Sequence, residues 1–246
     1  MSVLHSLTST EKHSSQDPRH IAIIPDGNRR WARKHGFPVL KGHDEGIRNL
    51  ERLLNWVEET DIEYISLWGF STENFNRDPH EVGGLFKLFS EWLSRLLDET
   101  DRYRDRYRIR FLGRIDKFPK VLRDRMKRLE ETYHTGKRQV NLLLGYGGRD
   151  EILYAVNRIL EDVRSGRLKN KRITERIFER YLYTSGIPDP DLIIRTSGEM
   201  RLSGLMPWQS VYSEFYVTRK LWPEFSKRDF KRALESYRKR VRRFGR

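Results

Sequence analysis

Short apolar runs alternate with amphipathic stretches along most of the chain, and this alternation restricts the fold more than any other feature. Residues 20–24 are almost continuously apolar, which is typical of a strand buried on both faces of a sheet. Further strands are predicted at 64–70, 107–112, 140–144, 191–195 and 214–217. Helices are predicted between them, at 29–35, 47–57, 82–97, 121–133 and 152–163, with a basic helix at the end. This order predicts an α/β domain with a mainly parallel central sheet flanked by helices.

The chain is expected to form one domain after a short leader. Residues 1–17 are rich in Ser, Thr and His and have no apolar period, which predicts a mobile leader. No repeat or long linker divides 18–246. There is no Cys, which excludes disulfides, thiolate metal sites and a Cys nucleophile. No apolar run reaches the roughly 18 residues of a membrane span, and no signal peptide is visible, so we expect a soluble, cytoplasmic protein.

The chain is strongly basic, with 49 Lys and Arg against 35 Asp and Glu, a formal net charge of +14. Such a charge favours anionic partners and brings nucleic acid into consideration. However, acidic residues are mixed into each basic stretch, at 102–110, 120–128 and 227–246, as on the solvated faces of helices. A basic surface without a dedicated ligand, small anionic ligands, an anionic membrane and nucleic acid all fit this composition.

The turn after the first predicted strand carries the most chemical information. The sequence Pro25-Asp26-Gly27-Asn28 ends the strand, and Arg29 and Arg30 open the next helix. Free amides at a helix start and adjacent arginines bind phosphate groups, and a carboxylate among them indicates Mg²⁺ between Asp26 and the phosphate. The alternative is an ordinary turn in which Asn28 caps the helix.

Polar groups also follow other predicted strands, at what should be the same edge of the sheet. Residues 69–77 supply hydroxyl, amide and guanidinium groups, and residues 193–203 contain two arginines and two serines. Neither a P-loop nor G-x-G-x-x-G occurs, which counts against nucleotides. Two arginine-lined anion sites with a metal carboxylate indicate a transferase that joins two phosphorylated substrates.

Two further features allow more than one interpretation. His43 could cap a helix, donate to a phosphate, or act as an acid or base, and the first two are favoured near a helix start. The apolar stripe at 85–97 is core packing by default. If it instead forms the wall of an elongated cavity, the substrate has a long apolar tail.

Together these segments resemble the cis-prenyltransferase (undecaprenyl diphosphate synthase) family. The motifs are HIAIIPDGNRRWA at 20–32, Gly42-His43, FSTENFNR at 70–77, NLLLGYGG at 141–148, IRTSGE at 194–199, Trp208-Gln209, YSEFY at 212–216 and LWPEF at 221–225. The resemblance implies that 18–246 is a catalytic domain that condenses an allylic prenyl diphosphate with isopentenyl diphosphate. Diphosphate is released and a cis (Z) double bond is made. The family also implies Mg²⁺, a homodimer and a hydrophobic substrate tunnel over the sheet.

The resemblance also implies roles for individual residues. Asp26 would bind Mg²⁺ and assist departure of the allylic diphosphate, with Glu214 as a second metal ligand. Asn74 matches the residue usually assigned to proton removal, but a neutral amide is a weak base, so we expect it to position or relay while a diphosphate oxygen takes the proton. The other expected substrate-binding residues are Gly27, Asn28, Arg29, Arg30, Trp31, His43, Ser71, Thr72, Glu73, Phe75, Arg77, Arg195, Arg201, Leu202 and Ser203. Of these, Arg195, Arg201 and Ser203 would hold the diphosphate of the acceptor. The stretch 243–245 resembles a closing motif that reaches the partner subunit's site.

The sequence departs from the family pattern at several positions. Val39 replaces an arginine, so that Lys41 or Arg29 would have to bind diphosphate in its place. Met200 stands where many members have histidine, and Ser197 replaces a frequent glycine. Arg138 stands where the tunnel floor of long-chain members is typically apolar. These departures predict a short-to-medium product or an unusual acceptor.

Alternatives to the standard reaction remain open at this point. The same fold could transfer the prenyl group to an alcohol or to a second allylic diphosphate. A non-catalytic partner subunit is a more distant alternative, because the arginines and carboxylates of the predicted site are retained. Peripheral contact with an anionic membrane is compatible with the basic surface. A nucleic-acid partner is not expected.

Overall fold

The computed structural model describes residues 17–169 and 172–240. Its centre is one six-stranded sheet in the order β3-β4-β2-β1-β5-β6, in which every pair of neighbours is parallel. The strands are β1 (His20–Ile24), β2 (Tyr64–Ser71), β3 (Tyr107–Leu112), β4 (Arg138–Tyr146), β5 (Leu192–Arg195) and β6 (Glu214–Val217). The predicted α/β class is therefore confirmed. Most of the predicted leader and the closing motif at 243–245 lie outside the described residues.

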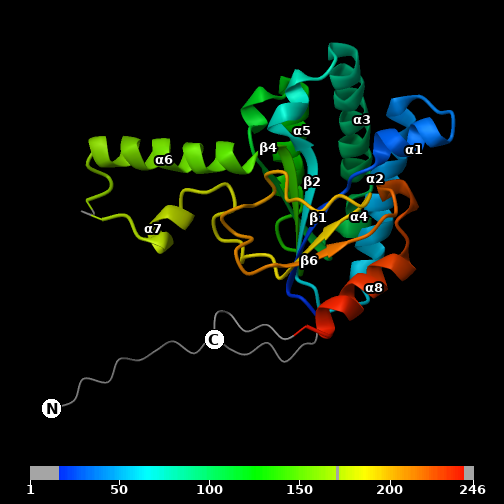
Figure 1. Ribbon diagram of the computed structural model, residues 1–246. Coiled ribbons are helices and arrows are strands. Elements are labelled where there is room, and N and C mark those ends of the chain that lie inside the picture. Colours follow the sequence, from blue (N-terminus) through cyan, green and yellow to red (C-terminus); the bar gives the residue numbers. More distant parts are fainter. Residues whose placement is uncertain (1–16, 170–171, 241–246) are drawn as a thin grey trace.

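The helices fall between the strands, as the alternation predicts (Figure 1). They are α1 (Asn28–Lys34), α2 (Val39–Val57), α3 (Pro79–Asp98), α4 (Thr100–Tyr103), α5 (Lys120–Thr132), α6 (Gly148–Arg164), α7 (Glu175–Glu179) and α8 (Lys227–Arg238). The 3-10 turns are η1 (Thr72–Asn76), η2 (Ile115–Lys117) and η3 (Trp222–Glu224). Within the described residues, no helix is both long and apolar enough to cross a bilayer.

Helix α2 begins well before its apolar stripe. The stripe starts near Ile47, but the helix starts at Val39, directly after Pro38. Proline is common at helix starts. Its fixed φ suits a helix, and an N–H at this place would have no intrahelical partner, so its absence costs no helical hydrogen bond. The early start places His43 on α2 rather than in a loop. Helix α3 begins at Pro79, and the Asp78 side chain caps it by accepting hydrogen bonds from the amides of His80 and Glu81.

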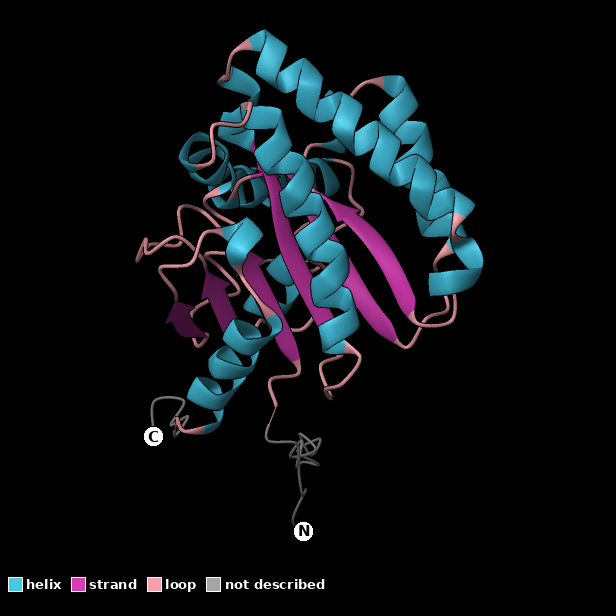
Figure 2. Ribbon diagram, turned by 90° about the vertical axis from the view of Figure 1, so that its right-hand side faces the viewer, coloured by secondary structure: helices cyan, strands magenta, loops and turns pink. Residues whose placement is uncertain are grey.

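The two faces of the sheet are covered differently. Helices α2, α3, α5 and α8 bury one face, against residues such as Ile21 and Leu67. Figure 2 shows helices crossing in front of the strands. The other face packs on an irregular segment that contributes Leu205 and Met206, while α6 extends away from the sheet (Figure 1). The stripe on α3 is buried, with Phe89, Trp92, Leu93 and Leu96 in the core, which agrees with core packing for most of its length.

Candidate active site

A cavity of about 540 Å³ opens at the carboxyl edge of the sheet, and we call it the edge cavity. Strand β1 lies between β2 and β5, so the segments that follow these three strands meet there. Helix α2 adds His43 and α3 adds Leu85. The lining residues are Ile24, Pro25, Asp26, Gly27, Asn28, Arg29, Arg30, Arg33, His43, Trp68, Gly69, Phe70, Ser71, Asn74, Arg77, Leu85, Arg195 and Ser203.

The turn after β1 requires a glycine at position 27. Gly27 has a φ of +111°, a conformation that L side chains rarely adopt. A Cβ at this position would lie 2.9 Å from Leu221 Cδ2. The turn is also fixed by the Thr196 hydroxyl, which donates to the carbonyl oxygen of Asp26 at 2.7 Å. The carboxylate of Asp26 therefore projects from a rigid turn.

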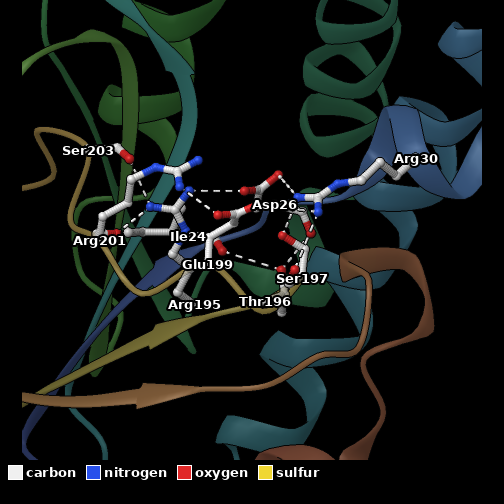
Figure 3. A network of polar contacts seen from close by, with 9 residues as sticks. All are labelled: Ile24, Asp26, Arg30, Arg195, Thr196, Ser197, Glu199, Arg201 and Ser203. Atoms are coloured by element: carbon white, nitrogen blue, oxygen red, sulfur yellow. Dashed lines mark hydrogen bonds and ion pairs between the residues drawn. The ribbon is translucent and has the colours of Figure 1, made fainter.

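Asp26 is held between two arginines (Figure 3). Its Oδ2 lies 3.0 Å from Arg195 Nη2, and its Oδ1 lies 3.2 Å from Arg30 Nη2. Burial acts to raise the pKa of Asp26, but the hydrogen bond from Arg195 and the charges of both arginines outweigh it, and the pKa is lowered. Asp26 is therefore an ionised carboxylate at neutral pH.

The segment after β5, residues 196–206, forms the second wall and is called the β5 loop. Arg195 is almost fully buried, and its Nη1 donates to Ser203 Oγ at 2.8 Å and to the carbonyl oxygen of Arg201. Three non-glycine residues of this loop, Ser197, Ser203 and Met206, have positive φ values of 74°, 53° and 43°. A left-handed conformation costs such residues roughly 1–2 kcal/mol each. Strain of this kind is concentrated at functional sites.

A third group of charges surrounds Glu81, which the sequence analysis did not single out. Glu81 Oε1 lies 3.1 Å from Arg77 Nη1 and 3.8 Å from His43 Nε2, and its Oε2 lies 3.7 Å from Arg29 Nη2. Burial, with smaller contributions from the charges of Arg77 and Arg29, lowers the pKa of His43 to about 4. His43 is therefore neutral, and its free ring nitrogen is available for a hydrogen bond rather than a charge.

Several buried polar atoms at the edge cavity have no hydrogen-bond partner. They are Asn28 Oδ1, Arg29 Nε, His43 Nε2 and Arg195 Nε. Such orphaned groups cost stability and are uncommon in proteins unless a ligand or water pairs with them. Three of the four atoms are nitrogens that can donate a hydrogen bond, which points to an anionic ligand.

The geometry of Asn74 argues against a role as a base. Its Oδ1 accepts a hydrogen bond from the Ser71 amide at 3.0 Å, and this contact fixes the orientation of the side-chain amide. One lone pair of the amide oxygen is therefore in use, and the NH₂ group can donate to a ligand. This geometry is compatible with a positioning role for Asn74, which stays a prediction.

Most of the predicted diphosphate ligands are brought together at the cavity. Its lining includes Asp26, Gly27, Asn28, Arg29, Arg30, His43, Ser71, Asn74, Arg77, Arg195 and Ser203. It also includes Arg33, which the sequence analysis missed although it lies one helical turn after Arg29 and Arg30. Arg29 reaches the cavity, whereas Lys41 pairs with Asp44, so Arg29 is the better replacement for the arginine absent at Val39.

Other predicted residues lie beside the cavity and do not line it. Trp31 packs on His35 and Phe37, and Phe75 packs in an aromatic cluster with Phe70 and Phe118. Thr72 adjoins Gly147, and Glu73 is exposed. Leu202 packs on the core, and Arg201 pairs with Glu199. Met200 is 81% exposed on the same loop.

Glu214 is not brought to Asp26 within this chain, which corrects its expected place beside that metal ligand. It begins β6, and its register partner is Leu192 at the start of β5, whereas Asp26 follows the end of β1. The two carboxylates therefore belong to opposite edges of the sheet. Glu214 is instead ion-paired with Arg240.

The donor set of the cavity fits a magnesium ion that arrives with a phosphorylated substrate. Within the described residues, no group of three or more His, Asp or Glu side chains could hold a metal alone. Mg²⁺ is commonly bound by one or two carboxylates together with substrate phosphate oxygens. Asp26 supplies one ionised carboxylate in a cavity otherwise lined by anion-binding groups.

Known proteins of one family match nearly the whole chain. Residues 24–245 match the family model for undecaprenyl diphosphate synthase. An isoprenyl transferase from Thermotoga maritima is 49% identical over 229 residues, covering 93% of this chain and 97% of the relative. A tritrans,polycis-undecaprenyl-diphosphate synthase (geranylgeranyl-diphosphate specific) from Thermoplasma volcanium is 46% identical over 235 residues, covering 93% and 89%.

Solved structures show the same relationship. The crystal structure of lavandulyl diphosphate synthase from Lavandula x intermedia, in complex with dimethylallyl diphosphate, has a TM-score of 0.89 and 35% identity. The match covers 94% of this chain and 99% of the other. The family model, the sequence relatives and the solved structure agree, and the chain belongs to the undecaprenyl diphosphate synthase family, the cis-prenyltransferases.

Proposed function

We propose that this prenyltransferase binds the diphosphates of its two substrates at the two ends of the edge cavity, with Asp26 between them. The enzyme condenses an allylic diphosphate with isopentenyl diphosphate, as its family does. The observation that carries the proposal is the position of Asp26, whose two oxygens pair with Arg30 on the α1 side and with Arg195 on the β5 side.

The allylic diphosphate is proposed to bind against α1. The first amides of a helix lack intrahelical partners, and here they adjoin Arg29 and Arg30 and face His43 and Arg77 across the cavity. Asp26 would hold Mg²⁺, which supplies charge stabilisation to the departing diphosphate. The arginines and the neutral His43 donate hydrogen bonds to the same leaving group.

The acceptor diphosphate is proposed to bind at Arg195 and Ser203, with Arg201 turning toward it. Arg195 is fixed by its contacts with Asp26 and Ser203, so its free Nε is held in place for an incoming anion. Asn74 orients the acceptor through its NH₂ group. The proton lost from the acceptor passes to a diphosphate oxygen, since that oxygen is more basic than an amide.

The apolar tail is proposed to run beneath α3, in the expected tunnel, and to stop early. Phe70 and Leu85 form the apolar end of the edge cavity, and beyond them the space is filled by aromatic side chains. A second, apolar cavity of only about 20 Å³ lies deeper, bordered by Trp92, Tyr103 and Tyr107. Arg138 is on the same strand face as Val140, and its guanidinium donates to the carbonyl oxygens of Ile62 and Thr60. This closure at the amino edge supports a short-to-medium product.

A homodimer is the proposed assembly. Helix α6 carries an exposed apolar stripe in the sequence order Leu153, Val156, Leu160 and Val163, with exposures of 62%, 39%, 45% and 46%. An apolar stripe on a helix that extends from the body is typical of a subunit interface. Within one chain Glu214 lies at the opposite edge of the sheet from Asp26, so any contact of Glu214 with a bound metal would need a partner subunit. Contact of the basic helix α8 with an anionic membrane stays a proposal that the charge of the chain supports.

One experiment identifies the allylic donor and the acceptor that the enzyme uses. The protein is incubated with Mg²⁺, labelled isopentenyl diphosphate and each allylic diphosphate from dimethylallyl to geranylgeranyl, and the products are analysed by mass spectrometry and NMR. We expect an extractable product with a new Z double bond. A product mass that lacks the isopentenyl unit would favour an alcohol or a second allylic diphosphate as acceptor. No product with any donor would favour a non-catalytic partner subunit.

A further inference from the structure

We infer that Ser197 is a positioning residue for Arg30, and through it for the diphosphate of the allylic donor. The inference rests on the proposed function. It assigns part of the affinity for the allylic donor to a residue on the wall of the cavity opposite α1. Ser197 belongs to the β5 loop, whereas Arg30 belongs to α1.

The backbone at position 197 does not require a serine. Its φ is +74°, and that of the following Gly198 is +83°, so the chain takes two left-handed residues in succession. Glycine adopts this conformation without a steric penalty, whereas a side chain is strained there. A contact made by the serine side chain would offset part of this strain.

That contact is with the guanidinium of Arg30 (Figure 3). Arg30 Nη2 donates to Ser197 Oγ at 2.5 Å, and Arg30 Nη1 donates to the Ser197 carbonyl oxygen at 3.4 Å. The same guanidinium pairs with Asp26 and lies 3.5 Å from Glu199 Oε1. Ser197 is thus the neutral acceptor in a set whose other members are carboxylates.

The position of the serine is fixed by the backbone around it. The Ser197 amide donates to the carbonyl oxygen of Lys220 at 2.7 Å. The Gly198 amide donates to the carbonyl oxygen of Thr218 at 2.8 Å. The hydroxyl therefore stands on a part of the loop that is tied to the segment after β6. A guanidinium bound to it is held at a defined place over the cavity.

A neutral anchor has a specific use in this site. When a cation that arrives with the diphosphate engages Asp26, the carboxylate is no longer free to hold Arg30. Arg30 has a long side chain that is 45% exposed, and it would otherwise lose its orientation. The contacts to Ser197 do not compete with the diphosphate for charge, so they keep the guanidinium in place and lower the entropic cost of donor binding.

The test separates the hydroxyl from the backbone strain. Ser197→Gly removes both, and Ser197→Ala removes only the hydroxyl. We expect each variant to bind a thio analogue of dimethylallyl diphosphate roughly five- to tenfold more weakly, a change within the range of one lost hydrogen bond. The KM for isopentenyl diphosphate stays within about twofold of the wild-type value, by the same scale. The melting temperature of Ser197→Gly is expected at or above that of the wild type, and above that of Ser197→Ala.

A second arm ties the effect to Arg30. In an Arg30→Met background, Ser197→Gly should weaken analogue binding no further, because the guanidinium it positions is absent. The inference is overturned if both serine variants bind the analogue as the active wild type does. It is also overturned if the loss of analogue affinity in the two serine variants follows their loss of melting temperature. It is overturned as well if Ser197→Gly weakens analogue binding in the Arg30→Met background. A wild-type protein that binds no analogue would overturn the proposed function itself.

Discussion

Asp26 and Arg195 are 169 positions apart in the sequence, and their side chains meet at 3.0 Å across the carboxyl edge of the sheet. The contact joins the turn after β1 to the last residue of β5, and the two are neighbours because β1 and β5 pair in parallel. Arg195 is 4% exposed and Asp26 30%, so the pair is only partly open to solvent. A ligand that enters the edge cavity reaches Asp26 from its open side.

Replacing Asp26 with Asn should separate binding from turnover. We expect kcat to fall by at least about 10²-fold, because one metal ligand and its charge stabilisation are lost. Inorganic diphosphate without Mg²⁺ should bind at least as tightly as to the wild type, since a carboxylate no longer repels it. Steady-state kinetics and calorimetry measure the two effects, and unchanged kcat would exclude Asp26 as the metal ligand.

Replacing Ser203 with Ala should affect the acceptor selectively. The hydroxyl accepts from Arg195 at 2.8 Å, and its loss frees the guanidinium and removes a donor to the acceptor diphosphate. We expect the KM for isopentenyl diphosphate to rise roughly tenfold, with the KM for the allylic donor unchanged. Ser213→Ala is the control, because Ser213 Oγ donates to Pro190 outside the cavity lining. A larger rise for the allylic donor would reverse the assignment of the two ends.

Replacing Trp92 with Leu should lengthen the product. Trp92 borders the small apolar cavity beneath α3, and a smaller side chain enlarges it in the direction of the tail. Trp56→Leu is the control, since Trp56 packs on Phe225 and Phe230 at the far end of α2. Mass spectrometry of the products should show added isoprene units for the first variant only. Long-chain polyprenyl products from the wild type would contradict the proposed closure.

The stability of the fold should fall as the pH falls from 7 to 5, partly through His20. Burial lowers the pKa of His20 to about 4, against 6.5 in the unfolded chain. The unfolded state therefore binds a proton first, and between pH 6.5 and 5 this one group removes about 2 kcal/mol of stability. Burial raises the pKa of the nearby Asp189 to about 6. The folded state therefore binds this proton first, so Asp189 adds stability as the pH falls, which is opposite to the effect of His20.

The His20 contribution is isolated by comparison with His20→Gln. Its loss of stability between pH 7 and pH 5, measured by urea unfolding, should be smaller than that of the wild type by about 2 kcal/mol. Equal losses in the two proteins would show that His20 titrates normally in the folded state.

Replacing Leu160 with Glu should weaken the proposed dimer. A charge in the apolar stripe of α6 must be desolvated when a partner covers it. Arg158→Gln alters the charge by the same amount on the opposite face of α6 and is the matched control. Sedimentation should show monomer for Leu160→Glu and dimer for the control. A wild-type monomer at micromolar concentration would rule out the proposed assembly.

Much of this architecture follows from local patterns in the sequence. β1, β3 and β6 have the predicted bounds, because continuous or alternating apolar residues set them independently of the rest of the chain. β4 is longer than predicted, since Arg138 and Gln139 pair with β3 in spite of their polarity. Such pairing is a property of the sheet, which periodicity cannot reveal.

Site residues within sequence motifs could be predicted from the sequence. Site residues that are recognised only by their three-dimensional contacts could not. Asp26, Arg195 and Ser203 could be assigned from strand ends and from the family resemblance. Glu81 lies on α3, outside the segments that follow the strands, and its contacts with Arg29, Arg77 and His43 arise from packing of α1, α2 and α3. Glu214 was expected as a second metal ligand from the family resemblance, but it begins β6 whereas Asp26 follows the end of β1, so the two lie at opposite edges of the sheet.

The most direct test of the account is a crystal structure with Mg²⁺ and a non-reactive thio analogue of the allylic diphosphate. We predict that the diphosphate lies against the first amides of α1, within hydrogen-bond distance of Arg29 or Arg77, with a cation between it and Asp26. The Asp26–Arg30 contact should be open in that complex. A diphosphate bound elsewhere, or an Asp26 still paired with both arginines beside an empty edge cavity, would contradict the account.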